Sequence, residues 1–267
     1  MLEAMHVAAT GMQAQETRIQ VLANNLANAD TPGFKVSRAR FQDLLYVEER
    51  LPGSQSSQIS FVPTGTSIGL GTRTASVDKI MTEGNLEQTN NPLDVAIQGD
   101  GFLQILLPNG TLAYTRDGSL RLNQNGQLVT LDGYLLTPAI TIPQGTSTLA
   151  NSGVTIAPGG QVSVQLNNQP VPTQVGQIQL VRFLNPSGLQ PLGQNLYQQS
   201  ETSGPPQIGI AGENGFGTIL QGYLEMPNES VVQEMVGLIE AQQAYEAGSK
   251  AVQMSDQMYS TANNLVR

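Results

Sequence analysis

The sequence predicts an α+β fold in which discontinuous helices from the two ends of the chain form a coiled-coil-like domain around a β-rich central domain. Both ends lack proline over long stretches and repeat their apolar residues at helical spacing. The middle carries Asp-Gly and Asn-Gly pairs every seven to nine residues, which is the spacing of turns in a β-meander. The segments between these regions are rich in Gly, Ser, Thr and Pro, which favours extended connections.

The N-terminal helix is predicted over residues 2–28, which contain no proline. Its apolar residues recur at alternating steps of three and four, with one interruption at Glu16: Leu2, Met5, Ala9, Met12, Ile19, Ala23 and Leu26. Such a repeat is a heptad seam suited to packing against another helix. We expect the helix to end at Asp30-Thr31-Pro32-Gly33, because proline cannot continue the hydrogen-bond ladder.

The C-terminal helix is predicted to begin near Ser230, which stands three residues before Gln233 at the spacing of a capping box. Large residues then recur every seven positions: Val231, Leu238, Tyr245, Val252, Tyr259 and Val266. Small residues occupy the intervening steps: Ala241, Gly248, Ser255 and Ala262. Large residues alternating with small ones suit close packing of one helix against another.

A single pair of helices leaves part of this apolar surface exposed, because the C-terminal helix has a neighbouring line of apolar residues, including Ala251 and Met258. Monomeric proteins rarely expose large apolar patches, so the sequence predicts polymerisation through the terminal helices. The predicted assembly residues are Leu2, Met5, Met12, Ile19, Leu26, Val231, Leu238, Tyr245, Val252, Tyr259 and Val266.

The central meander is predicted from turns at Asp100-Gly101, Asn109-Gly110, Asp117-Gly118, Asn125-Gly126 and Asp132-Gly133. Strands are expected at 102–107, 120–122, 127–131, 162–166 and 175–183. The predicted organisation is an N-terminal helix and turn (1–40), an extended arm (41–80), a β-rich domain (81–200), a returning extended arm (201–227) and a C-terminal helix (228–267).

The composition argues against nucleic-acid binding and against common catalytic chemistry. Lys and Arg number 12 against 21 Asp and Glu, and the net charge of −9 disfavours a phosphate-binding groove. The chain has no cysteine and one histidine, His6, so we predict no disulfide, metal site or cofactor. The sequence shows neither a secretory signal peptide nor an apolar run long enough to span a bilayer.

Three stretches, which follow one another in order along the chain, resemble signatures of the bacterial flagellar rod and hook proteins. They are Asn24-Asn25-Leu26-Ala27-Asn28 with Thr31-Pro32-Gly33-Phe34-Lys35, then residues 90–102, then residues 242–250. In the last stretch, Gln243 stands where the family usually has Arg, and Gly248 where it usually has Asn. The residues of the N-terminal motif are Asn24, Asn25, Leu26, Asn28, Pro32, Gly33 and Phe34.

Within that family, residues 41–46, 51–57 and 65–73 are similar to the distal rod protein. The resemblance implies a non-enzymatic structural protein that is exported unfolded and polymerises helically into a rigid drive shaft transmitting torque to the hook. It implies a place in the flagellar basal body, in the rod that crosses the periplasm. The implied partners are other copies, proximal rod proteins, the hook protein, the peptidoglycan-ring and outer-membrane-ring proteins, the rod cap and the export apparatus.

Two alternatives remain open from the sequence. One is another rod or hook subunit of the same family. The other is a peptidoglycan-acting hydrolase using a pair of carboxylates such as Asp94 and Asp100, or Asp117 and Asp132. The second is disfavoured because Asp100, Asp117 and Asp132 each precede glycine at a predicted turn, where Asp is common for backbone reasons alone.

Overall fold

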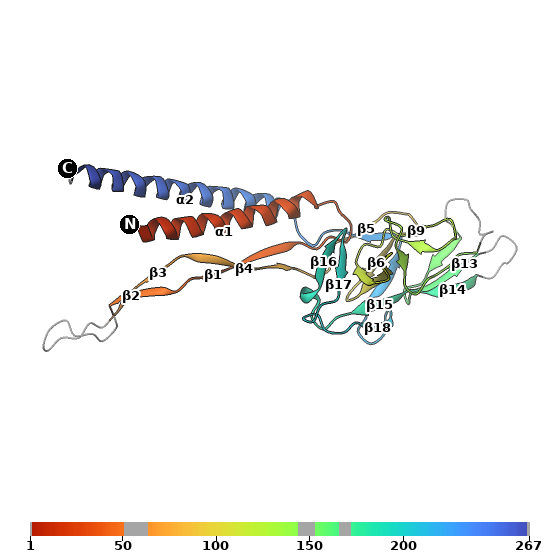
Figure 1. Ribbon diagram of the computed structural model, residues 1–267. Helices are drawn as coiled ribbons and strands as arrows, with labels where there is room; N and C mark the ends of the chain where they lie inside the picture. The colour runs from red at the N-terminus through yellow and green to blue at the C-terminus, as the bar shows by residue number, and fades with distance from the viewer. Residues whose placement is uncertain (1, 51–63, 144–152, 166–171, 266–267) are drawn as a thin grey trace. The chain divides into compact units, whose positions relative to one another are not determined.

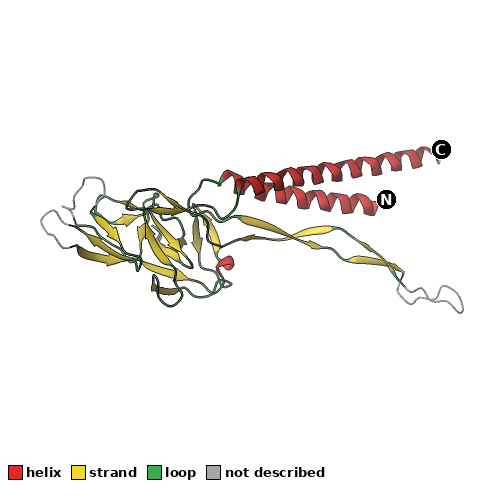
Figure 2. Ribbon diagram, turned by 180° about the vertical axis from the view of Figure 1, so that it is seen from behind, coloured by secondary structure: helices red, strands yellow, loops and turns green. Residues whose placement is uncertain are grey.

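The computed structural model describes residues 2–50, 64–143, 153–165 and 172–265 (Figure 1). The chain divides into two compact units, each discontinuous in sequence. Unit 1 consists of Met1–Ala27, Ser37–Asp78 and Ser230–Arg267, and unit 2 of Asn28–Val36 and Lys79–Glu229. A helix at each end of the chain and strands throughout the middle confirm the predicted α+β class (Figure 2).

Unit 1 is built on two long helices, α1 (Leu2–Ala27) and α2 (Val231–Leu265), which lie side by side in both views (Figures 1 and 2). Both helices therefore form where the sequence predicts them. After α1, the Thr31 amide donates to the Asn28 carbonyl at 3.1 Å, and the chain turns at Pro32 as expected. Neither helix has, in its described residues, a stretch apolar enough to cross a membrane.

Unit 1 also contains a ribbon of paired strands. β1 (Ser37–Asp43) pairs with β4 (Thr72–Lys79), and β2 (Tyr46–Arg50) pairs antiparallel with β3 (Thr66–Gly69). The ribbon contacts α1, since the Thr72 amide donates to Thr10 Oγ1 at 3.4 Å. These strands occupy the segment expected as an extended arm, of which residues 51–63 lie outside the described part.

Unit 2 is built around one large sheet. Its main path runs β16-β17-β8-β7-β11-β10-β9, and β15 pairs with both β7 and β18. The strands of this sheet are β7 (Phe102–Leu106), β8 (Leu112–Thr115), β9 (Arg121–Leu122), β10 (Leu128–Val129), β11 (Leu135–Leu136), β15 (Gln179–Arg182), β16 (Gln190–Gly193), β17 (Leu196–Gln198) and β18 (Gln207–Ile210).

Smaller sheets complete unit 2. A three-stranded sheet follows the order β12-β13-β14, and two pairs join β19 to β6 and β20 to β5. Their bounds are β5 (Leu86–Gln88), β6 (Val95–Gln98), β12 (Val154–Ile156), β13 (Gln161–Val164), β14 (Thr173–Gln177), β19 (Thr218–Gln221) and β20 (Tyr223–Glu225), and a short 3₁₀ helix, η1, covers Pro186–Gly188.

The predicted meander is present in two pieces rather than one. Gly110, Gly126 and Gly133 have φ near +80° in the β7–β8, β9–β10 and β10–β11 connections, as hairpin turns require. The turn expected at Gly118 is not a hairpin, because β8 pairs with β17 and not with β9. A Cβ at Gly118 would fall 1.6 Å from the Val95 carbonyl oxygen, so close backbone approach explains that glycine.

The prediction of one strand at 175–183 is wrong in one respect, because the segment contains parts of two strands, β14 and β15. β14 pairs with β13 and β15 pairs with β7, so the two belong to different sheets. Between them, the Ile178 amide donates to the Gly160 carbonyl at 2.7 Å. Ile178 is itself fully buried where the chain passes from one sheet to the other, so the break falls at an apolar residue that gives no local sign of a strand end.

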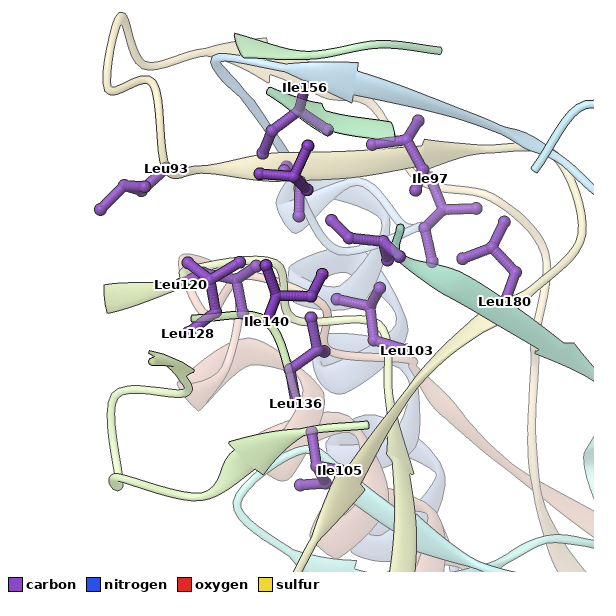
Figure 3. Close-up of a cluster of buried hydrophobic side chains, with 14 of the residues drawn as sticks. Leu93, Ile97, Leu103, Ile105, Leu120, Leu128, Leu136, Ile140, Ile156 and Leu180 are labelled. Atoms are coloured by element: carbon purple, nitrogen blue, oxygen red, sulfur yellow. The ribbon is translucent and has the colours of Figure 1, made fainter. Parts of the chain in front are cut away.

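The core of unit 2 is aliphatic and lies between the sheets. In Figure 3, Leu103, Leu128, Leu136 and Leu180 point into one cluster from four strands, with Ile140 from a loop beside them. A second, aromatic cluster holds Phe102, Tyr114, Phe183 and Tyr197, with edge-on rings 4.8 to 6.1 Å apart. These two clusters give unit 2 an interior of its own.

Candidate assembly surface

α1 and α2 pack antiparallel with a regular register. Asn25 Nδ2 donates to Glu234 Oε1 at 3.3 Å, and Arg18 pairs with Glu240 at 3.5 Å. Further along, Met12 lies against Gly248. The same register places Leu2 opposite Gln257, so residues 258–265 of α2 extend beyond the start of α1 (Figure 1). We call residues 258–265 the α2 overhang.

The face of α2 that meets α1 is made of small residues. Ala241 is fully buried, and Ala14 of α1 is almost so. A Cβ added to Gly237 would lie 3.5 Å from Leu22 Cδ2, and one added to Gly248 would lie 2.8 Å from Met12 Cγ. The line of small residues, rather than the line of large ones, therefore lets the two helices approach closely.

The opposite face of α2 is apolar and exposed. Val232, Met235, Val236 and Ile239 are spaced as one helical stripe, and each is 48% to 68% exposed. On the wheel of a straight helix, this stripe lies opposite Ala241. We call these four residues the α2 outer stripe. Sequence reasoning missed it, although spacing at i, i+3, i+4 and i+7 was the available signal.

The predicted assembly residues lie along the edges of the α1–α2 seam. Met5, Met12, Ile19, Leu26, Leu238 and Val252 are half-buried, and Val231, Tyr245 and Tyr259 are exposed. The side chain of Leu2 and all of Val266 lie outside the described part of the chain. Tyr259 belongs to the α2 overhang, where no α1 residue stands opposite it. In residues 3–27, by contrast, no large apolar side chain of α1 is exposed.

The asparagines of the N-terminal motif have different surroundings. Asn25 is buried, donates to the Ser37 carbonyl at 2.9 Å and accepts from the Ser37 amide at 2.9 Å. Asn28 Oδ1 accepts from Thr31 Oγ1 at 3.3 Å, in the turn after α1. Asn24 is exposed. Asn25 therefore fixes the chain where it leaves α1 and enters β1.

The rest of the motif is anchored in unit 2. Asn195 Nδ2 donates to the Pro32 carbonyl at 2.8 Å, and the Phe34 ring is buried with Lys79 Nζ 4.6 Å from its centroid. Gly33 has φ +70°, and a Cβ there would lie 2.5 Å from the Asp117 amide nitrogen. Only glycine fits this position without moving the backbone of the neighbouring segment.

A buried ion network lies next to this anchor. The Glu225 carboxylate pairs with Lys35 Nζ and, at 3.2 Å, with Arg116 Nη1, and all three side chains are at most 3% exposed. Burial lowers the pKa of Lys35, and the Glu225 charge offsets part of that effect. Glu225 Oε1 also accepts from the Gly84 amide at 2.9 Å. One carboxylate thus joins three segments that are far apart in sequence.

Protein-family models match three separate parts of the chain. Three family models match: the flagella basal body rod protein at residues 5–35, the flagellar hook protein FlgE/F/G D1 domain at residues 96–164, and the flagellar basal body rod FlgEFG protein C-terminal at residues 220–265. The matched residues include the N-terminal motif, strands β7 to β11 of the large sheet and the whole of α2. Strands β15 to β18 of that sheet lie outside the three matches.

Several full-length relatives are named flagellar basal-body rod protein FlgG. The chain is 45% identical to the flagellar basal-body rod protein FlgG of Borreliella burgdorferi, with 100% of both chains covered. It is 46% identical to FlgG of Caulobacter vibrioides, with 99% of both covered, and 34% identical to FlgG of Bacillus subtilis, with 100% of both covered. The predicted resemblance to the distal rod protein is thereby confirmed, and the chain belongs to the FlgG family of structural flagellar basal-body rod proteins.

Proposed function

We propose that this chain polymerises helically as the distal rod subunit of the flagellum and forms a rigid shaft that transmits torque to the hook. The observation that carries the proposal is the arrangement of α2. Its small residues face α1, while the α2 outer stripe and the overhang expose large apolar side chains. A surface of this kind favours burial against further copies over exposure to water.

In the proposed rod, the paired ends of the chain, residues 1–40 and 228–267, act as a coiled-coil-like inner layer. Residues 81–200 form the β-rich outer wall, and the segments 41–80 and 201–227 connect the layers. The role is mechanical and non-enzymatic. Proximal rod proteins, the hook protein, the peptidoglycan-ring and outer-membrane-ring proteins, the rod cap and the export apparatus are the proposed partners, along the part of the rod that crosses the periplasm.

The test is a pair of charge substitutions on α2. Tyr245→Asp and Val252→Asp place carboxylates on the edge of the seam, where burial between copies penalises a charge. We expect both variants to lose polymers in electron micrographs while hydrogen exchange of the backbone amides in β7 and β15 shows that unit 2 stays folded. Deletion of residues 1–20 is expected to have the same effect.

The control is Gln20→Asp, which places the same charge at an exposed polar position of α1, whose residues 3–27 expose no large apolar side chain. It is expected to polymerise like the parent chain. Normal polymers from Tyr245→Asp and Val252→Asp would refute the proposed function.

A further inference from the structure

Unit 2 contains a cavity of about 330 Å³ that combines apolar walls with two arginines. Its lining includes Asp100, Phe102, Arg116, Arg182, Phe183 and Leu184. Leu184 is 87% exposed, the largest exposed fraction among the large apolar side chains of the described residues. The cavity therefore offers an apolar surface to a partner from outside unit 2.

The arginines of this cavity have unused hydrogen-bonding capacity. Arg182 pairs with no carboxylate in the described part of the chain. Its guanidinium donates to Gly215 O and Gln207 Oε1, both at 3.4 Å, and lies 5.3 Å from the centroid of the Phe216 ring. Arg116 is almost fully buried, and its Nε has no acceptor among the described residues. Asp100 is the one acidic side chain in the lining, and because Arg116 already pairs with Glu225, Arg182 is the lining arginine without a carboxylate partner among the described residues. The cavity is thus suited to a carboxylate that has an apolar neighbour.

A group of this kind projects from another part of unit 2. Leu131 is 63% exposed in the turn between β10 and β11, and the carboxylate of its neighbour Asp132 has no partner in the described part of the chain. The turn is held by hydrogen bonds from the Thr130 amide to Tyr134 O at 2.9 Å and from the Gly133 amide to Thr130 O at 3.0 Å. Because it is already ordered, the turn loses little conformational entropy on docking.

The turn and the cavity lie at opposite ends of β7. Phe102 lines the cavity, whereas Leu106 pairs with Leu135 next to the turn. Four residues of a strand separate them by about 14 Å. The turn therefore cannot fill its own cavity, but it can fill that of another copy. A contact between two different patches of identical subunits generates a ring or an open helix when it is repeated.

We propose that the turn at Leu131 and Asp132 of one copy docks into this cavity on a second copy. Asp132 pairs with Arg182, and Leu131 packs against the apolar wall next to Leu184. The contact rests on the proposed function and adds to it a specific side-to-side junction between the β-rich parts of neighbouring subunits. Its occupant is a second copy of this chain.

The test uses cysteine cross-linking, since the chain has no cysteine of its own. A Leu131→Cys chain and a Leu184→Cys chain are mixed under polymerising conditions and treated with a short bis-maleimide. The expected product is a covalent heterodimer. Adding Asp132→Asn to the first chain, or Arg182→Gln to the second, is expected to lower its yield at least fivefold. Asn keeps the preference of Asp for a turn before glycine, so it tests charge alone.

A charge-reversal pair distinguishes loss of the contact from loss of folding. Combining Asp132→Arg in the first chain with Arg182→Asp in the second is expected to restore the yield to within twofold of the parent pair. The control is Asp43→Asn in both chains, because Asp43 is also an acidic residue near an exposed leucine, Leu45. It is expected to leave the yield unchanged.

The outcomes separate this contact from the proposed function. Polymers that form without the heterodimer, or a yield that Asp43→Asn lowers and Asp132→Asn does not, would overturn the contact and leave the proposed function standing. Failure of the parent chain to polymerise under any condition would instead overturn the proposed function.

Discussion

The Met12 side chain of α1 lies directly against Gly248 of α2, where a Cβ would come within 2.8 Å of Met12 Cγ. Of the two glycines in α2, Gly237 and Gly248, Gly248 lies nearer to a side chain of α1. The helix pair is therefore sensitive to side-chain volume at this position.

Gly248→Leu is expected to separate the helices and lower the melting temperature of the helical signal at 222 nm, because the added carbons overlap Met12. The matched control is Gly11→Ala on α1, since a Cβ at Gly11 meets nothing within 4 Å. That control removes a helix-interior glycine and should stabilise α1 by up to about 1 kcal/mol. Equal effects of the two substitutions would argue against close packing at Gly248.

Gly33→Ala is expected to destabilise unit 2 in urea unfolding followed by tyrosine fluorescence. Gly33 combines φ +70° with a site where a Cβ would overlap the Asp117 backbone, so alanine suffers both strain and a clash. Gly110→Ala is the control, because Gly110 has φ +80° but open space around the added Cβ. Gly110→Ala should lower the free energy of unfolding by about 1 kcal/mol, and Gly33→Ala should lower it by clearly more.

Glu225→Gln is expected to cost about 3–5 kcal/mol of unfolding free energy, because it leaves Lys35 and Arg116 buried without a counter-charge. Asp78→Asn breaks an ion pair that is largely exposed, between Asp78 and Arg40, and should change stability little. Both values come from denaturant titration at pH 7. A Glu225→Gln variant as stable as the parent would show that the buried network contributes no net stability.

Tyr197→Phe is expected to reduce the loss of stability at alkaline pH. Burial raises the pKa of Tyr197, so above about pH 10 the unfolded chain releases a proton that the folded chain keeps. The contribution of Tyr197 to the free energy of unfolding therefore does not depend on pH below about pH 10, and it decreases as the pH rises above that value. Melting temperatures of both proteins between pH 8 and 11.5 check this, and parallel curves would contradict it.

Local signals in the sequence predicted the helices and the hairpin turns well. Proline, glycine and heptad spacing act within a few residues, so they placed α1, α2 and the turns at Gly110, Gly126 and Gly133. The division of 175–183 between two sheets was not predictable in this way. It depends on which distant strands, β13 and β7, lie beside each half.

The sequence predicted only part of how α1 and α2 pack, and the predicted assembly residues stay a prediction. Heptad spacing identified the large residues along the seam, but it could not show that small residues would meet α1 and leave the α2 outer stripe exposed. The partners Lys35 and Glu225 stand 190 positions apart, and neither has a local signal of burial. Such pairs become visible only when the fold brings their segments together.

Methionine oxidation tests the central claim most directly, since Met235, Met254 and Met258 are each about half exposed on α2. The rate of sulfoxide formation at each methionine is measured by mass spectrometry in dilute monomer and in polymer. Burial of the exposed α2 surface between copies predicts rates in the polymer at least tenfold lower at Met235 and Met258. Polymers in which these two methionines oxidise as fast as in the monomer would contradict the account.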